Sequence, residues 1–98
     1  MGRVQIELER VISSWCDAEA DTYQPQDRLE GLWLTRFPVN PPYNPRGVVR
    51  LVNRIHGNTF FRNCDAARNI GPGFFASGGA IQTVQDLHDF LNPCDEEA

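Results

Sequence analysis

Four prolines within eight residues, from Pro38 to Pro45, interrupt the middle of this chain. Proline has no backbone N–H to donate and restricts the residue before it, so neither a helix nor a strand can run through this segment. The regular elements must therefore lie on either side of a stiff loop. Tyr43 lies within the loop and makes it a candidate recognition element, although a plain connection between two strands is the simpler interpretation.

The two ends of the chain carry the apolar period of amphipathic helices. Residues 3–16 place their large apolar side chains at helical spacing, in one stripe. Near the other end, Thr83 suits the N-cap of a second helix, and Asp86 suits the partner position of a capping box. Asn92-Pro93 predicts the end of that helix, and the acidic residues 93–98 predict a frayed tail.

The residues between these helices favour a small sheet. Residues 32–37 are a short aromatic and aliphatic run bounded by glycine and proline, which is typical of a strand. Residues 48–55 fit a helix or a strand, and their β-branched content favours a hairpin with residues 59–62. We therefore predict a single compact α+β domain over residues 1–98, with both terminal helices packed on one face of a mainly antiparallel sheet of about three strands. The predicted core consists of Leu8, Val11, Ile12, Trp15, Leu34, Phe37, Leu51, Ile55, Phe61, Leu87, Phe90 and Leu91.

Charge is segregated along the sequence. No Asp or Glu occurs from Gly31 to Cys64, and the thirteen carboxylates of the chain lie on either side of this acid-free segment. All nine basic residues are Arg, whose planar donor fork suits fixed contacts with carboxylates and phosphates. Arg50 and Arg54, four residues apart, lie on the same side of a helix or of a strand. Together with Tyr43 from the proline loop, the expected partner-binding residues are Arg36, Tyr43, Arg46, Arg50, Arg54 and Arg62.

Three interpretations of these arginines are open. They can pair with the acidic flanks of their own chain, which requires no ligand, although exposed ion pairs contribute only about 0–1 kcal/mol each. They can bind an acidic patch of another protein, because arginine and aromatic side chains contribute much of the binding energy in interfaces. They can also bind nucleic acid, with Trp33, Phe60 or Phe61 stacking on bases.

A glycine-rich stretch before the second helix is a candidate anion site, because glycines allow close backbone approach and a helix N-terminus presents free N–H groups. The Gly71–Gly79 loop does not have the spacing of a dinucleotide or nucleotide-phosphate fingerprint, and Asp86 and Asp89 occupy the first turns of the helix, so a structural loop is the favoured interpretation. The candidate ligand residues are Arg68, Gly73, Ser77, Gly78 and Gly79.

We predict no enzymatic activity, no cofactor and no metal site. No Ser or Cys occurs in the context of an activated nucleophile. Cys64, His88 and Cys94 offer metal-ligand types, but their spacing is not that of a zinc finger or ribbon.

The three cysteines are widely spaced and include no C-x-x-C pair, so we predict reduced thiols in a cytoplasmic protein. In a secreted protein, Cys64 and Cys94 would instead bridge and hold the C-terminal helix in place. The sequence has no membrane-spanning run and no signal-peptide pattern, and we predict no contact with a membrane.

These features favour a small, acidic, non-enzymatic protein that acts by protein–protein interaction. Inhibitors and adaptors of this size, including phage-encoded blockers of host enzymes, are the analogy, which rests on size and the lack of catalytic motifs. One alternative is a nucleic-acid-binding module that uses the Arg36–Arg62 segment. The other is a binder of small anionic ligands at the Gly71–Gly79 loop. No oligomeric state follows from the sequence.

Overall fold

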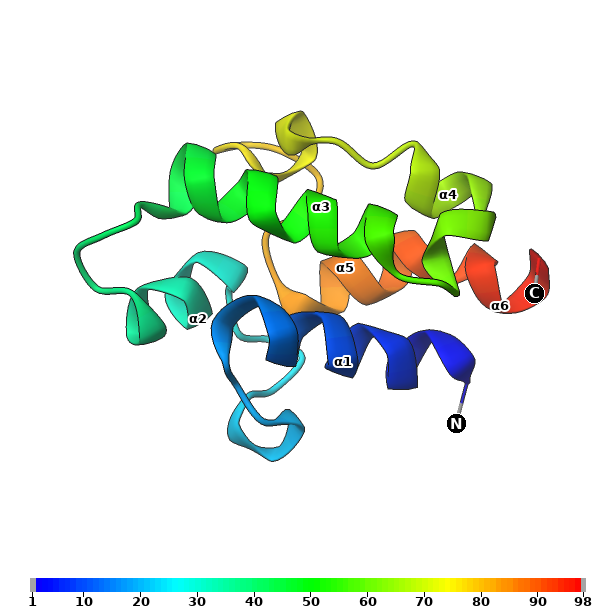
Figure 1. The fold of residues 1–98 in the computed structure, drawn as a ribbon, viewed down its shortest axis with the longest axis horizontal. Helices are drawn as coiled ribbons and strands as arrows, with labels where there is room; N and C mark the ends of the chain where they lie inside the picture. Colours follow the sequence, from blue (N-terminus) through cyan, green and yellow to red (C-terminus); the bar gives the residue numbers. More distant parts are fainter. Residues whose placement is uncertain (1, 98) are drawn as a thin grey trace.

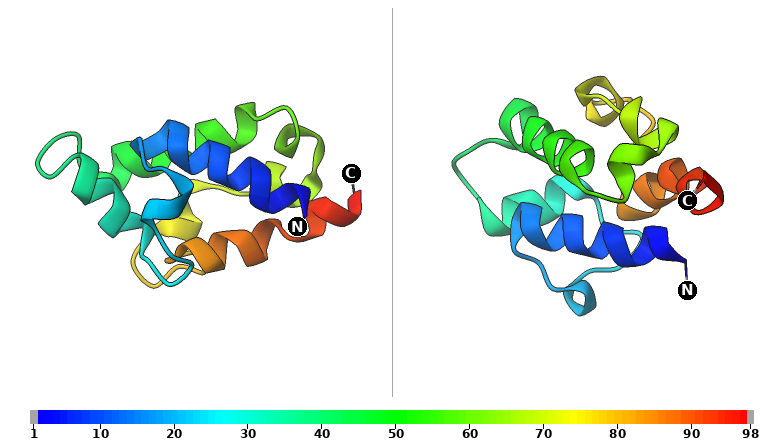
Figure 2. Two further views of the ribbon diagram at one scale, coloured as in Figure 1. Left: turned by 90° about the horizontal axis from the view of Figure 1, so that it is seen from below. Right: turned by 45° about the vertical axis from the view of Figure 1, so that its right-hand side comes forward.

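Six α-helices and four other helical turns make up the computed structural model, which describes residues 2–97. The α-helices are α1 (Arg3–Cys16), α2 (Leu29–Arg36), α3 (Val48–Gly57), α4 (Asp65–Arg68), α5 (Val84–Leu91) and α6 (Pro93–Glu97). The other turns are η1 (Ala20–Thr22), η2 (Tyr43–Gly47), η3 (Phe61–Asn63) and η4 (Pro72–Phe75). Helix α1 contacts both α3 and α5, and α2 lies at one end of the molecule (Figure 1). Figure 2 shows the same arrangement from two further directions.

The helices predicted near the two ends of the chain are confirmed. Helix α1 has the predicted bounds, and its apolar stripe is buried. Helix α5 begins after Thr83, whose hydroxyl accepts a hydrogen bond from the backbone N–H of Asp86, while the Asp86 carboxylate accepts from the backbone N–H of Thr83. This reciprocal pair is the predicted capping box.

The prediction of an α+β fold with a three-stranded sheet is wrong. Residues 32–37 fall mostly in α2, residues 48–55 in α3, and residues 59–62 in a turn and the first part of η3. An isolated antiparallel bridge between Arg28 and Thr83 is the β pairing present in residues 2–97.

The apolar period explains why residues 48–57 form a helix. Val48, Leu51, Val52 and Ile55 lie on one buried side of α3, and Ile55 is completely buried. Burial of this side outweighs the β-propensity of the valines, because helices in proteins are stabilised mainly by packing of an apolar face.

Helix α2 owes its position to Leu29 and Trp33, which lie one turn apart and are both completely buried. Gly31, which the sequence analysis treated as a boundary, lies inside the helix and is exposed. Leu34 is 42% exposed because it lies next to the buried Trp33 and points away from the core, so its place in the predicted core is wrong. Phe37 and Phe90 are half-buried, and the other predicted core residues are buried.

The proline loop packs on two tryptophans. The Trp33 and Trp15 rings stack with centroids 5.3 Å apart. The indole N–H of Trp33 donates to the carbonyl of Pro41 at 2.8 Å, and that of Trp15 donates to the carbonyl of Gly47 at 2.8 Å. A side chain at Gly47 would collide with the Trp33 ring, which explains the glycine there. The loop is therefore fixed on the core as it enters α3.

The C-terminal segment continues from α5 into one more short helix; the predicted fraying of residues 93–98 stays a prediction, and Ala98 lies outside the described residues. Residues 93–97 form α6, and a disulfide joins Cys64 to Cys94, which corrects the prediction of reduced thiols for these two residues. Cys16 is a free, buried thiol. The Asp95 carboxylate accepts a hydrogen bond from the backbone N–H of Val4 at 2.9 Å and so caps the start of α1 from another helix.

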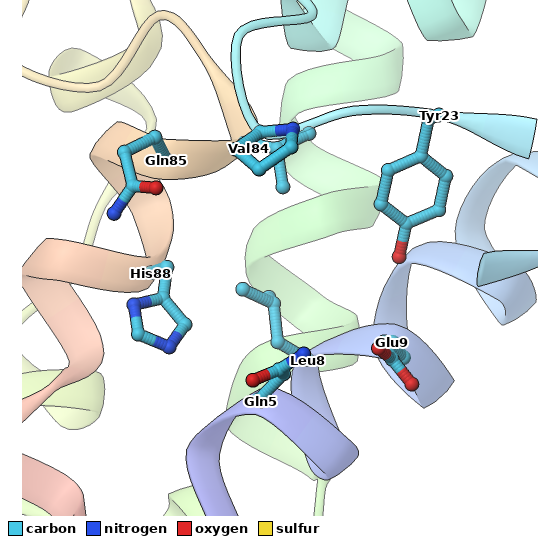
Figure 3. Close-up of a pocket in the computed structure, with 8 residues that line it drawn as sticks. Gln5, Leu8, Glu9, Tyr23, Val84, Gln85 and His88 are labelled. Atoms are coloured by element: carbon cyan, nitrogen blue, oxygen red, sulfur yellow. The ribbon is translucent and has the colours of Figure 1, made fainter. Parts of the chain in front are cut away.

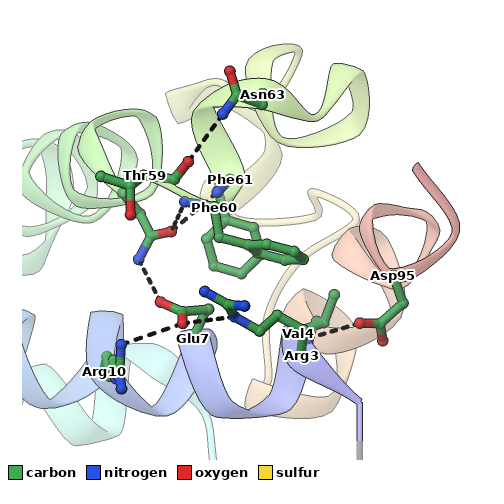
Figure 4. A network of polar contacts seen from close by, with 10 residues as sticks. Arg3, Val4, Glu7, Arg10, Thr59, Phe60, Phe61, Asn63 and Asp95 are labelled. Carbon is green, nitrogen blue, oxygen red and sulfur yellow. Dashed lines mark hydrogen bonds and ion pairs between the residues drawn. The ribbon is translucent and has the colours of Figure 1, made fainter. Parts of the chain in front are cut away.

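A buried carboxylate links α1 to the end of α3 (Figure 4). Glu7 is 3% exposed and accepts hydrogen bonds from Arg3 at 3.0 Å, Arg10 at 3.3 Å and the side-chain amide of Asn58 at 3.2 Å. The amide oxygen of Asn58 in turn accepts from the backbone N–H groups of Phe60 and Phe61. Burial by itself raises the pKa of a carboxyl, but the hydrogen bonds and positive charges of these partners outweigh it, so the pKa of Glu7 lies below its usual value.

Glu7→Gln is therefore expected to lower the free energy of unfolding at pH 7 by about 1 kcal/mol, a modest value because Arg3 and Arg10 extend into solvent. A carboxyl whose pKa is lowered by folding stabilises the protein above its unfolded-state pKa, and this contribution is lost as the pH falls through the lower, folded-state value. The difference between wild type and Glu7→Gln should thus be present at pH 7 and shrink as the pH falls below about 4.5. Urea unfolding at pH 7 and pH 3 measures it.

The matched control is Glu9→Gln, because Glu9 lies on the same helix and has no hydrogen bond or ion pair among the described residues. This change should leave the stability nearly unaltered at both pH values. Equal effects of the two substitutions would contradict the role assigned to the Glu7 network.

Candidate partner-binding surface

The exposed side of α3 carries arginines because the apolar period turns the other side inward. With Val48, Leu51 and Ile55 buried, the side chains of Arg50 and Arg54 are exposed, separated by one helical turn, about 6 Å along the axis. Arg46 precedes them in η2 and is also exposed. Val49, 42% exposed, and Asn53 lie among the arginines.

A groove runs beside these arginines, where the proline loop meets α3. Its volume is about 430 Å³. We call it the α3 groove, and it is lined by Trp33, Pro41, Pro45, Arg46, Val49, Arg50, Asn53 and Arg54. The lining combines three positive charges with apolar proline and valine surface and includes no carboxylate. Such a lining is complementary to a ligand that combines negative charge with apolar groups.

Ion pairing within the chain accounts for only part of the acid-free segment. Arg36 pairs with Asp17 at 2.9 Å and lies over the Phe37 ring, with 4.8 Å from the guanidinium carbon to the ring centroid. In the part of the chain that the structure describes, Arg46, Arg50, Arg54 and Arg62 have no ion pair. The acidic flanks therefore provide an ion-pair partner for Arg36 and none, among the described residues, for the arginines of the α3 groove.

The structure does not bring all six predicted partner-binding residues together. Arg46, Arg50 and Arg54 line the α3 groove, whereas Arg36 lies in a separate depression beside Asp17. Arg62 is exposed on η3, beyond the other end of α3.

Tyr43, the expected anchor in the proline loop, is 8% exposed and packs edge-on against Trp15, with ring centroids 6.3 Å apart. Burial, more than neighbouring charge, raises the pKa of Tyr43 to about 12. Its ring is part of the core and is not available to a partner.

Val49, Asn53, Pro41 and Pro45 are members of the groove that the sequence analysis missed. A helical interpretation of residues 48–55 would have put Val49 and Asn53 on the arginine side of the helix. No local pattern places the two prolines next to that helix, because their position depends on the packing of the loop on Trp33.

The Gly71–Gly79 loop uses its polar groups internally. The backbone N–H of Ile81 donates to the Phe74 carbonyl, and the Gln82 side-chain amide donates to the carbonyls of Ala76 and Gly79. A side chain at Gly79 would collide with the Phe74 carbonyl, and Gly78 has a φ of 80°, so the geometry of the turn accounts for both glycines.

The positive groups proposed for the anion site already have partners within the protein. Arg68 pairs with Asp65. The backbone N–H groups of Gln82 and Thr83 at the start of α5 both donate to the Asp86 carboxylate. A bound anion would have to displace these contacts.

The aromatic residues suggested for base stacking are not free either. Trp33 and Phe61 are completely buried. Phe60 is half-buried under the Arg3 guanidinium, whose central carbon lies 5.3 Å from the ring centroid. Stacking on Trp33 or Phe61 would require local unfolding, and stacking on Phe60 would require displacement of the Arg3 side chain.

Within residues 2–97, no group of three or more His, Cys, Asp or Glu side chains is arranged to hold a metal ion. No helix in the same range is long and apolar enough to span a bilayer. Two of the metal-ligand candidates, Cys64 and Cys94, are joined in the disulfide.

Comparison with known proteins identifies no relative: no protein-family model, curated protein or solved structure matches this chain.

Proposed function

We propose that this protein is a non-enzymatic interaction protein that binds an acidic surface of another protein through the α3 groove. The observation that carries this proposal is the alignment of Arg46, Arg50 and Arg54, without ion pairs among residues 2–97, beside apolar surface. Exposed arginine next to apolar surface is typical of interfaces, where both contribute to binding.

The mixed lining favours a protein partner over nucleic acid. Nucleic-acid binding is driven mainly by the release of counterions from phosphates, and a chain with a net charge of −4 has a weak general attraction for them. The prolines and Val49 give the groove an apolar part that matches protein side chains. The rings that the nucleic-acid alternative required are buried or half-buried.

The Cys64–Cys94 disulfide indicates the kind of compartment in which the protein would meet its partner. Disulfides persist in oxidising compartments and are rare in the cytosol. We therefore propose that this inhibitor or adaptor acts in an oxidising compartment rather than in the cytoplasm, as the sequence alone suggested. The phage-type analogy with blockers of cytoplasmic host enzymes gains no support from the disulfide.

Arg50→Glu/Arg54→Glu is expected to weaken partner binding at least about tenfold, because it places two carboxylates against the acidic patch of the partner. The test is a nuclease-treated pull-down from non-reducing extracts of the source cells and their medium, followed by measurement of the affinity for the recovered protein. The wild type should retain one stoichiometric protein, and the variant should lose it.

The matched control is Arg62→Glu, compared with Arg50→Glu alone, because Arg62 is exposed, has no ion pair among residues 2–97 and lies outside the α3 groove. This variant should bind as the wild type does. Equal loss of binding in both variants would show that net charge, and not the groove, causes the effect. Recovery of the partner only without nuclease treatment would indicate nucleic-acid binding instead. A partner that the folded Arg50→Glu/Arg54→Glu variant retains would contradict the assignment of the groove.

A further inference from the structure

A second pocket lies between α1 and α5, on elements that do not contribute to the α3 groove (Figure 3). Its volume is about 240 Å³, below the range of about 300–1,000 Å³ that is usual for drug-sized ligands. Leu8 and Val84, almost completely buried, form its apolar floor, with Pro25 beside them. A pocket of this size and shape suits a ligand of only a few non-hydrogen atoms with an apolar part.

The charge of the pocket is negative. Glu9 lines it and, among the residues that the structure describes, has no ion pair or hydrogen bond. No arginine lines the pocket, and the neighbouring Arg10 donates to Glu7 on another side of α1. Asp86, on the first turn of α5, is held in the capping box and is not among the lining residues. Glu9 therefore provides an unpaired carboxylate for a ligand at this site, and His88, which also lines the pocket, lies beside Asp89, with 3.9 Å from its Nδ1 to the carboxylate.

Tyr23 lies across the pocket from His88, on the same side as Glu9 (Figure 3). Burial, followed by the nearby charge of Glu9, raises the pKa of Tyr23 to about 12, so the phenol stays neutral at physiological pH. The face of a neutral tyrosine ring attracts a cation. The amides of Gln5 and Gln85 add oxygen acceptors at the opening.

We propose that this pocket binds a small organic ammonium ion. The positive group would lie beside the Glu9 carboxylate and the Tyr23 side chain, and its alkyl part would cover Leu8 and Val84. Aromatic rings attract alkylated ammonium groups, a carboxylate adds the opposite charge, and the small volume excludes larger ligands.

The proposal is tested with choline chloride as the probe and 3,3-dimethylbutan-1-ol as its uncharged isostere. Two-dimensional NMR of the full chain should show saturable shifts at Leu8, Tyr23 and Val84 with choline, and at least about tenfold weaker binding of the alcohol. Sodium chloride at matched concentration controls for ionic strength. Absence of saturable shifts, or equal binding of choline and the alcohol, would overturn the proposal.

Three substitutions assign the contacts. Glu9→Gln should weaken choline binding at least about tenfold, and Tyr23→Leu about three- to fivefold, whereas Tyr23→Phe should bind as the wild type does because the ring remains. Unchanged NMR signals of α3 show that each variant is folded. Undiminished choline binding by folded Glu9→Gln would overturn the proposal. Arg50→Glu/Arg54→Glu should bind choline normally, which makes this site independent of the proposed partner surface.

Discussion

Replacement of both Cys64 and Cys94 by alanine is expected to lower the free energy of unfolding by about 3–4 kcal/mol. The disulfide closes a loop across a sequence separation of 30 residues, and such a cross-link restricts the unfolded chain. It also holds α6 against α4, so that Asp95 can cap α1. Urea unfolding of the oxidised wild type and the double variant at pH 7 measures the difference.

Two controls accompany this measurement. The wild type treated with a reductant should resemble the double variant, because both lack the cross-link. Cys16→Ala keeps the disulfide and should lose less stability, since it removes only a small buried thiol. A double variant within about 1 kcal/mol of the oxidised wild type would show that helix packing alone holds α6 in place.

The second large effect concerns Trp33. Trp33→Ala is expected to cost about 3–5 kcal/mol, the usual range for removal of a buried aromatic side chain. The ring is completely buried and stacks on Trp15, and its centroid lies 4.4 Å from the ring centroid of Phe37. The substitution also removes the donor to the Pro41 carbonyl, which fixes the proline loop beside α3. The free energy of unfolding from urea titration is the measured quantity.

Leu34→Ala is the matched control, because Leu34 is the next residue on α2 and is 42% exposed. We expect a change within about 0.5 kcal/mol. A strand through residues 32–37 would have buried Leu34, so a large loss in this variant would contradict the helix as well as the exposure of this residue.

Local signals were sufficient for α1 and α5. The apolar stripe of residues 3–16 has no competing pattern, and Thr83 with Asp86 forms a capping box within four residues of sequence. In residues 48–57 the local signals disagree: the valines favour a strand, whereas the apolar period favours a helix. The packing of α3 against α1 decides in favour of the helix, and sequence propensity does not include that packing.

Helix α2 was missed for a related reason. It is eight residues long, contains Gly31 and has no side-chain cap, so little in its own sequence favours a helix. Its stability comes from Leu29 and Trp33, which are buried among other elements.

The candidate site was predictable in part. Arg50 and Arg54 lie on one side in any regular structure, so their alignment followed from spacing alone. The groove beside them did not, because it forms where the loop that carries Pro41 and Pro45 meets α3. The disulfide could not be predicted from the sequence either. The choice between free thiols and a bridge depends on the separation of the Cys64 and Cys94 Cα atoms, which is 5.5 Å in the fold.

The hydrogen bond from Val4 to Asp95 has a practical consequence for handling the molecule. It brings the first and last helices together at one end of the long axis, whereas α2 and the loop that leads into α3 lie at the other end (Figure 1). A purification tag, a chip-surface linker or a fused domain joined before α1 or after α6 therefore starts at the end of the molecule opposite to α2 and the proline loop. Attachment before α1 or after α6 presents the α3 groove to solution in the same way, and both kinds of attachment should capture the same partner.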